Sequence, residues 1–225
     1  MSNATLSEPG AGIALKNVIN GKLENNICTT NIRGIFLSSS SNNTIENNII
    51  CSNNYDDGIY LYSLNDNNII RKNNCSENGR YGIYLYNSRI NIILYNTLYR
   101  NTGYGVYIGS YSTRNTIHHN YFYQNNGASK GVVGNCQAFD DSGSNYWYDD
   151  NAMEGNYWSN WDGTGWGTPN AYPIDGGAGA YDMYPLGNPA VPELSHIPTT
   201  TIITIIAISI ISLILTKHNH KPKSK

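Results

Sequence analysis

Residues 58–62 read Gly-Ile-Tyr-Leu-Tyr, and variants of this phrase recur through the first half of the chain. The copies start 22 to 24 residues apart, and no helix-like segment separates them. Aliphatic and aromatic residues alternate within the phrase, as in a short β-strand with two different faces. A period of this length built from strand-like phrases predicts a solenoid. The other copies are Gly12-Ile-Ala-Leu, Gly34-Ile-Phe-Leu, Gly82-Ile-Tyr-Leu and Gly105-Val-Tyr-Ile.

A second phrase, an apolar residue followed three residues later by asparagine, keeps the same period. The consensus of leucine-rich repeats is absent, so the pattern favours a parallel β-helix in which each repeat forms one coil and coils stack about 4.8 Å apart. Asparagine suits a turn, and stacked amides can bond from coil to coil. The predicted asparagine column is Asn26, Asn48, Asn73, Asn96 and Asn120.

The same alignment predicts which apolar side chains point inward. About five coils are enough for a continuous core, because a solenoid needs at least about three repeats. The inward columns are expected to be Ile35/Ile59/Ile83/Val106, Leu37/Leu61/Leu85/Ile108 and Ile45/Ile70/Ile93/Ile117.

The repeats resemble those of the right-handed parallel β-helix repeat family, which includes pectin-active enzymes, surface adhesins and the NosD accessory protein of nitrous oxide reductase. The resemblance covers residues 10–130. It implies an all-β chain whose residues 11–130 form a right-handed, single-stranded parallel β-helix of about five coils of 22–25 residues. It says little about activity, since the repeated positions are core positions.

Residues 131–187 have little periodicity and are rich in Gly, Asp, Tyr and Trp. The stretches Ala138-Phe-Asp-Asp-Ser-Gly-Ser-Asn-Tyr-Trp147 and Gly155-Asn-Tyr-Trp-Ser-Asn-Trp161 resemble the closing segment of NosD-like β-helix proteins, which often sit on archaeal surfaces. An open last coil would expose strand edges and core. We therefore expect an irregular, aromatic-rich C-terminal cap.

The aspartates of this segment raise the alternative of a calcium site, because calcium prefers carboxylate oxygens. Aspartate beside glycine or asparagine is first of all a turn signal, so a structural cap is favoured over a metal site. If the segment does bind a cofactor, calcium is the expected one. The candidates are Asp140, Asp141, Asp149 and Asp150, with Asp162, Asp175 and Asp182 further along.

The C-terminus reads as a membrane anchor. Residues 197–216 are uncharged and apolar over about one bilayer crossing, and four lysines follow in residues 217–225. The positive-inside bias places this tail in the cytoplasm, so the β-helix domain is expected outside the cell, on a stalk of residues 188–196. A cleaved sorting signal is the alternative. Residues 1–10 show neither a signal peptide nor a capped first coil, which favours an N-terminally truncated chain.

Composition and cysteine positions agree with this location. Charged residues make up 13% of the chain and the net charge is −2, with no basic patch for nucleic acid. Cys28 and Cys75 fall in one inward column two coils apart, too far for a disulfide. Cys51 lies one residue past that column and is expected to face outward, and Cys136 falls in the cap.

Two groups of polar residues invite a catalytic or metal-binding interpretation. Asp56 and Asp57 are adjacent carboxylates, but the repeat places Arg80 one coil after Asp56 and Arg33 one coil before Asp57. Cross-coil ion pairing is therefore favoured over catalysis, as it is for Glu46 with Arg71. His118 and His119 are expected on opposite faces of a strand, where they cannot share a metal ion.

An aromatic ribbon is the main candidate binding surface. Its residues recur with the repeat on the outward face, where rings can stack on sugars; the alternative is that stacking merely stabilises the sheet. Replacing Tyr60 and Tyr84 by serine is expected to abolish glycan retention without unfolding. The predicted ribbon is Phe36, Tyr60, Tyr84 and Tyr107, with Tyr62 and Tyr86 beside it.

Together these features predict a membrane-anchored, cell-surface β-helix protein that binds carbohydrate or other surface molecules without cleaving them. Two alternatives stay open: a polysaccharide lyase, hydrolase or epimerase, and a NosD-like accessory protein in copper-centre maturation.

Overall fold

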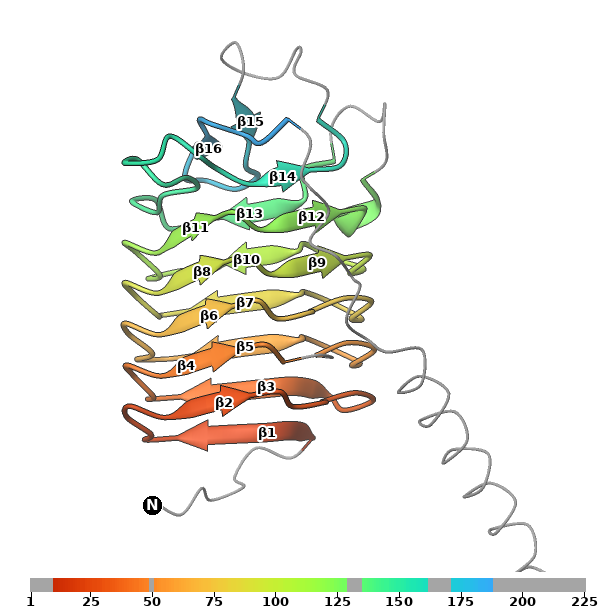
Figure 1. Cartoon of the computed structure of the whole chain (residues 1–225), viewed down its shortest axis with the longest axis vertical. Helices are drawn as coiled ribbons and strands as arrows, with labels where there is room; N and C mark the ends of the chain where they lie inside the picture. The colour runs from red at the N-terminus through yellow and green to blue at the C-terminus, as the bar shows by residue number, and fades with distance from the viewer. Residues whose placement is uncertain (1–9, 49–50, 129–134, 162–170, 188–225) are drawn as a thin grey trace, which may run out of the picture. The chain divides into compact units, whose positions relative to one another are not determined.

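The computed structural model describes residues 10–48, 51–128, 135–161 and 171–187 (Figure 1). Contacts divide the chain into a first unit of residues 1–187 and a second of residues 188–225. The predicted membrane segment, residues 197–216, lies outside the described residues. Within the described ranges no helix is both long and apolar enough to span a bilayer.

The first unit is an all-β parallel solenoid of about five coils, as the repeat predicts. Each coil adds one strand to each of two long parallel sheets. The first sheet consists of β1 (Ala11–Lys16), β3 (Arg33–Ser38), β5 (Ile59–Tyr62), β7 (Ile83–Tyr86), β10 (Val106–Ile108) and β13 (Ala138–Asp140). The second consists of β2 (Lys22–Glu24), β4 (Thr44–Glu46), β6 (Ile69–Arg71), β8 (Ile92–Leu94) and β11 (Thr116–His118).

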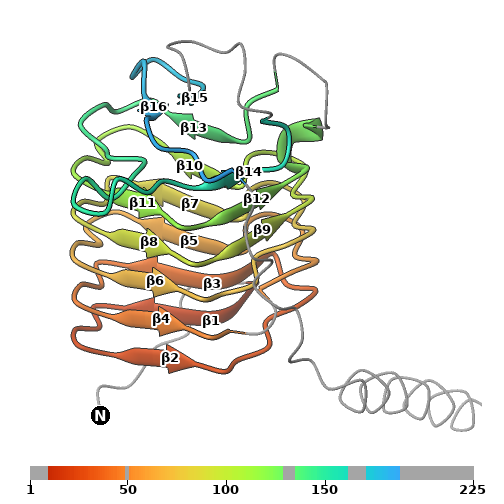
Figure 2. The ribbon, with the colours of Figure 1, turned by 45° about the horizontal axis from the view of Figure 1, so that its top comes forward.

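A third, shorter parallel sheet follows the second around the coil (Figure 2). Its strands are β9 (Thr97–Tyr99), β12 (Tyr121–Tyr123) and β14 (Tyr157–Trp158). One turn of 3₁₀-helix, η1 (Asn125–Gly127), follows β12, and an antiparallel pair, β15 (Tyr172–Pro173) and β16 (Tyr181–Asp182), comes last.

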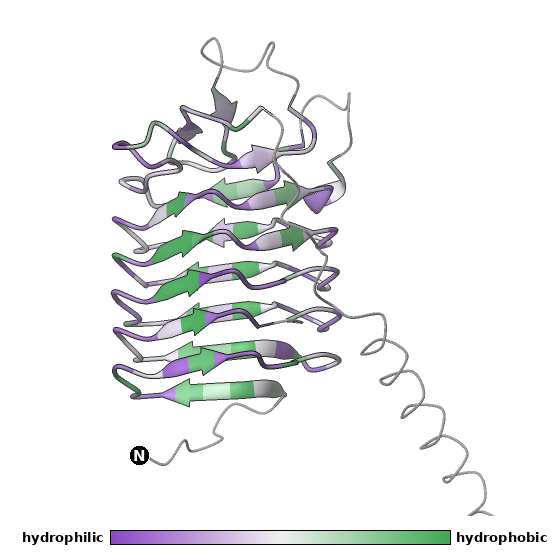
Figure 3. Cartoon of the chain, viewed as in Figure 1, coloured by the Kyte–Doolittle hydropathy of each residue, from purple (hydrophilic) through white to green (hydrophobic). Residues whose placement is uncertain are grey.

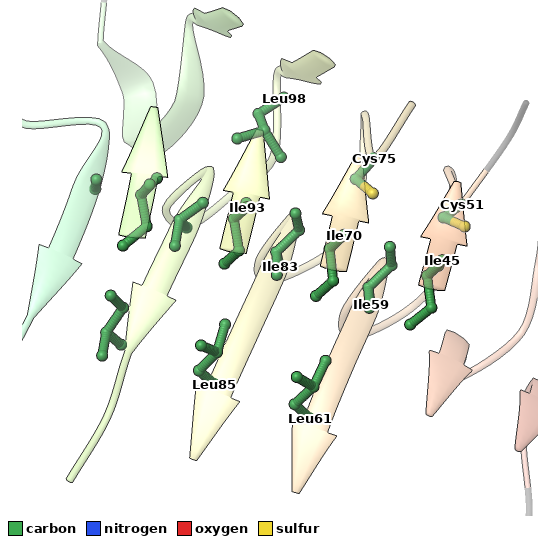
Figure 4. Close-up of a cluster of buried hydrophobic side chains, with 14 of the residues drawn as sticks. Ile45, Cys51, Ile59, Leu61, Ile70, Cys75, Ile83, Leu85, Ile93 and Leu98 are labelled. Carbon is green, nitrogen blue, oxygen red and sulfur yellow. The ribbon is translucent and has the colours of Figure 1, made fainter. Parts of the chain in front are cut away.

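The predicted apolar columns form the core. Ile35 pairs with Ile59 and Ile59 with Ile83, in the register that the repeat predicts. Residues of all three columns are fully buried between the sheets. The hydrophobic strand positions therefore lie above one another from coil to coil (Figures 3 and 4). Burial at this scale is the main stabilising contribution, at about 25 cal/mol per Å² of apolar surface.

Three amide ladders run along the corners between sheets, where the sequence predicted one. In the predicted ladder, Asn48 donates from its backbone N and its Nδ2 to Asn73 Oδ1, at 3.1 and 2.8 Å. The Asn73 Nδ2 in turn donates to Asn96 Oδ1 and to the Ile45 carbonyl. The other ladders are Asn43/Asn68/Asn91/Asn115/Asn145 and Asn31/Asn54/Asn78/Asn101/Asn125.

Every ladder asparagine follows a residue with positive φ. The residues before the predicted ladder are Asn25, Asn47, Lys72, Tyr95 and His119, with φ between 52° and 58°. The left-handed conformation turns the chain at the corner, so the ladder asparagine points inward while the residue before it faces out. Asparagine tolerates this conformation, whereas larger side chains adopt it at a cost of about 1 kcal/mol.

The prediction for Cys51 was wrong. Its side chain is fully buried in the core, in line with Cys75 and Leu98 on the following coils (Figure 4). Cys51 comes three positions after Asn48, whereas Cys75 comes two positions after Asn73, so Cys51 takes the inward position that the sequence assigned one residue earlier. Cys28, Cys51, Cys75 and Cys136 are all buried free thiols.

The described part of residues 131–187 is more regular than expected. β13 pairs with β10 and β14 pairs with β12, both in parallel, so the sheets continue beyond the last recognisable repeat. Trp158 stacks on Phe122 at 4.1 Å and on Tyr172 at 4.0 Å between ring centroids. These rings extend the apolar core into the C-terminal segment.

Candidate functional site

An aromatic ladder covers the outer face of the first sheet. The strand register places Phe36 beside Tyr60, Tyr60 beside Tyr84, and Tyr84 beside Tyr107. The sequence predicted these four residues and missed the fifth, Phe139 on β13, which pairs with Tyr107. We define the aromatic ladder as these five rings. The missed ring follows its neighbour by 32 residues rather than by the repeat length, so periodicity could not reveal it.

The rings of the ladder pack closely against one another. Tyr60 and Tyr84 are parallel at 4.5 Å between centroids, and so are Tyr107 and Phe139. Phe36 and Tyr60 are only 7% and 8% exposed, so the prediction that these two rings are freely exposed was wrong. Burial raises the pKa of the Tyr60 hydroxyl above its usual value. Replacing Tyr60 by serine would therefore disturb the packing of the ladder as well as any contact that Tyr60 makes with a ligand.

A second row of tyrosines beside the ladder is more open. Tyr62 pairs with Tyr86 in the register of β5 and β7, and their rings lie parallel at 5.7 Å. Tyr62 is 44% exposed and Tyr86 is half-buried. Tyr62 is therefore the most exposed ring of the predicted ribbon, whereas Tyr86 is half-buried like Tyr84 and Tyr107.

A charged cluster borders the ladder at the start of the same strands. Arg33 Nη2 lies 3.4 Å from Asp56 Oδ2, and Arg80 Nη1 lies 3.5 Å from Asp56 Oδ1. Both guanidinium groups also lie over ladder rings, Arg33 at 5.0 Å from the Tyr60 centroid and Arg80 at 5.1 Å from that of Tyr84. The cross-coil pairing predicted for Asp56 and Arg80 is confirmed. Such pairs and cation–π contacts hold neighbouring coils in register.

Asp57 is the unusual member of this cluster. Its side chain is fully buried, Arg33 Nε is 4.0 Å from its Oδ2, and neither carboxylate oxygen has a hydrogen bond of normal geometry to a described residue. Burial, and next the charge of Asp56, raise the pKa of Asp57 to about 7, against the opposing effect of the two arginines. A carboxyl with such a pKa suits acid–base chemistry, but a buried one is out of reach of a polymeric substrate.

The two histidines lie together, contrary to prediction. His118 Nδ1 and His119 Nδ1 are 2.6 Å apart, and His119 Nε2 is 2.6 Å from Glu154 Oε2. His118 ends β11, whereas His119 has a φ of 55° and turns the corner before Asn120. The alternation of a strand therefore does not extend to His119, and both imidazoles face the same side. The position of His119 immediately before a ladder asparagine is the signal that could have revealed this.

The two most buried cap aspartates serve the hydrogen-bond ladders. Asp140 accepts bonds from Asn145 Nδ2 and Trp147 Nε1, and Asp182 accepts bonds from Asn156 and Trp158 Nε1. Burial raises the pKa of Asp182 to about 6.

Three further calcium candidates lie nearer the surface, and Asp162 lies outside the described residues. Asp149 accepts the Asn151 amide, Asp141 accepts the Gly177 amide, and Asp150 is exposed. No group of three or more His, Cys, Asp or Glu side chains in the described residues is arranged to hold a metal ion.

Comparison with known proteins gives a family. The family described as periplasmic copper-binding protein (NosD) matches residues 1–163, which include most of the solenoid. Neither the curated proteins nor the solved structures gave a match. A periplasmic family agrees with a β-helix domain outside the cytoplasm, and the match covers well over half of the chain. The chain therefore belongs to the NosD family of β-helix proteins.

Proposed function

We propose that this protein is a membrane-anchored surface protein that binds polysaccharide or surface glycoconjugates on the outer face of its first sheet, without cleaving them. The observation that carries the proposal is the pair Tyr62 and Tyr86, parallel, at least partly exposed and continuous with the aromatic ladder. Sugar rings have apolar faces that stack on aromatic rings, and tyrosine adds a hydroxyl for hydrogen bonding.

The surroundings support binding rather than catalysis. Asp56 forms structural ion pairs with Arg33 and Arg80. Asp57 is buried. Both arginines of this cluster already contact Asp56, so neither guanidinium is free to select an acidic glycan. Recognition then rests on ring stacking, which requires a rigid aromatic surface, and the packed ladder beneath Tyr62 provides one.

The test compares two tyrosine pairs in the full chain. Tyr62→Ser with Tyr86→Ser should reduce retention on an immobilised polysaccharide about thirtyfold, since each of the two lost ring contacts is worth on the order of 1 kcal/mol. The matched control is Tyr99→Ser with Tyr123→Ser, an aromatic pair at 5.4 Å on β9 and β12. Tyr62→Phe with Tyr86→Phe keeps the rings and isolates the hydroxyls. Equal retention by both serine pairs would contradict the proposal.

A second candidate function is an accessory role in the maturation of a copper centre. The family description favours it, since the matched family is named for copper binding. The cysteines are poor donors for such a role, because they are buried, and the contact with Cys51 together with burial raises the pKa of the Cys28 thiol. Copper would have to use other side chains of this chain.

A further inference from the structure

We propose that the aromatic face selects uncharged polysaccharides over acidic ones, and that Asp141 is the residue that determines this specificity. One sugar ring lies over Gly109, in a gap between Tyr86 and Asp141. The inference rests on the proposed glycan binding, and it adds to it the class of glycan and the position of one sugar ring.

Backbone hydrogen bonds place the three residues of this gap side by side. The Gly109 amide donates to the Leu85 carbonyl at 2.8 Å, and the Asp141 amide donates to the Ile108 carbonyl at 3.0 Å. In a parallel ladder these bonds set Gly109 beside Tyr86, and Asp141 beside Gly109 one strand further along. The row of outward positions beside the aromatic ladder is therefore Tyr62, Tyr86, Gly109 and Asp141.

The glycine leaves one face of Tyr86 open. The Tyr62 and Tyr86 rings stack, with 10° between their planes, so the opposite face of Tyr86 is turned along the row toward Gly109. Two strand spacings, about 9.6 Å, separate the backbones of Tyr86 and Asp141, which leaves room for a ring between them.

The floor of the gap is aromatic. A Cβ atom at Gly109 would lie 3.3 Å from ring atoms of both Tyr84 and Tyr107, and Gly109 itself is buried. The edges of these two half-buried rings therefore cover the glycine backbone. A sugar ring in the gap contacts the edges of Tyr84 and Tyr107 below it and the face of Tyr86 beside it, which suits the apolar face of a sugar.

Asp141 supplies a carboxylate at the other side of the gap. Its side chain is exposed, and its Oδ1 accepts the Gly177 amide at 3.3 Å. Its second oxygen can accept a hydrogen bond from a sugar hydroxyl. Burial raises the pKa of the Tyr107 hydroxyl, and the charges of Tyr81 and then Asp141 add to that shift. The carboxylate is therefore close enough to act on the aromatic face.

The charges around the gap favour an uncharged ligand. A carboxylate accepts hydrogen bonds from hydroxyl groups but repels the carboxylate or sulfate group of an acidic sugar. Residues 135–187, which follow on the Asp141 side of the gap, contain no lysine or arginine. Arg33 and Arg80, which border the ladder, already contact Asp56. An acidic glycan therefore meets the negative charge of Asp141 at this gap.

The test measures retention of the full chain on two matched pairs of immobilised polymers at low salt: hydroxyethyl and carboxymethyl cellulose, and hydroxyethyl and carboxymethyl starch. Wild type should favour the hydroxyethyl member at least about fivefold, the effect of one pair of like charges about 4 Å apart in water. Asp141→Asn keeps an acceptor for the Gly177 amide and removes the charge, so it should increase retention on the carboxymethyl polymers and abolish this preference. Asp150→Asn makes the same change in net charge at another exposed position and should leave the preference unchanged.

Gly109→Tyr tests the position of the sugar ring. The backbone of Gly109 is outside the left-handed region, so a side chain is tolerated there, and a tyrosine would continue the row and fill the gap. It should reduce retention at least about tenfold, and much more than Gly109→Ala, with circular dichroism confirming that both variants are folded. Equal losses for these two variants, or a preference that Asp141→Asn leaves unchanged, would overturn the inference while leaving glycan binding intact. Failure of wild type to bind either hydroxyethyl polymer would instead contradict the proposed function, and the inference with it.

Discussion

At the scale of single residues, the corners of the coil account for most of the local chemistry. A residue in the left-handed conformation turns outward, and the asparagine after it turns inward to join a ladder. This rule places His119 beside His118 and Tyr95 beside His119. It also explains why strand alternation, applied to adjacent residues at a corner, gave the wrong face for the histidines.

Asp57 provides a pH-dependent prediction at this scale. Its pKa is about 7 in the folded protein and 3.8 for the free group, so folding favours the protonated form. The folded state therefore loses stability as pH rises from about 4 to about 7, by on the order of 1.4 kcal/mol per pKa unit. Asp57→Asn removes this dependence. In urea unfolding, the stability of the variant relative to wild type should increase by a few kcal/mol between about pH 4 and about pH 8.

The control for Asp57 is Asp150→Asn, an exposed carboxylate whose substitution should give a constant difference across the same pH range. Asp182, whose pKa is also raised, is present in every protein compared, so its contribution cancels. A difference between Asp57→Asn and wild type that does not change with pH would show that Asp57 is ionised and well paired in the folded protein.

At the scale of elements, the amide ladders tie coils together where strands end. Each interior asparagine accepts through its side-chain oxygen from the coil before it and donates through its side-chain nitrogen to the coils on both sides, all within buried surroundings. A buried backbone donor left without a partner is costly, at about 1–3 kcal/mol. The ladders therefore contribute specificity of register in addition to stability, because a slipped coil would leave donors unpaired.

Asn73→Ala tests this contribution. The change removes the acceptor for two donors of Asn48 and the donor to the Ile45 carbonyl, so we expect a loss of at least about 3 kcal/mol in the free energy of unfolding. The matched control is Asn26→Ala, the first described member of the same ladder, whose half-buried side chain donates to the Glu24 carbonyl and to Asn48 Oδ1. It should cost less than about 1 kcal/mol. Similar losses for both variants would contradict the role of the ladder.

The elements also show what sequence could and could not reveal. The columns through Ile59 and Ile70 and the first asparagine ladder followed from the repeat alone, because a parallel solenoid places equivalent residues directly above one another. Cys51 was misplaced because one extra residue interrupts its coil. Phe139 and Glu154 were missed because each is further along the chain from its partner than one repeat length. The contacts of Phe139 with Tyr107 and of Glu154 with His119 therefore do not follow from the period of the sequence.

At the scale of the whole molecule, the regular coils and the aperiodic segment form one continuous core. The stack of Phe122, Trp158 and Tyr172 passes from the last regular coil into the segment beyond it. The ladder through Asn120 likewise ends on Asn156 and then Asp182, a carboxylate that needs no further acceptor. This continuity supports the closing role proposed for residues 131–187, and it gives the aromatic face the rigid support that sugar stacking requires.

The most direct test of the account is to incubate the full chain with a panel of polysaccharides, with and without calcium. Bound protein, new reducing ends and unsaturated uronate products would be measured in the same samples. The account predicts retention on at least one polysaccharide, with no new products and no dependence on calcium. Release of products would contradict it and would make Asp56 and Asp57 the first residues to replace.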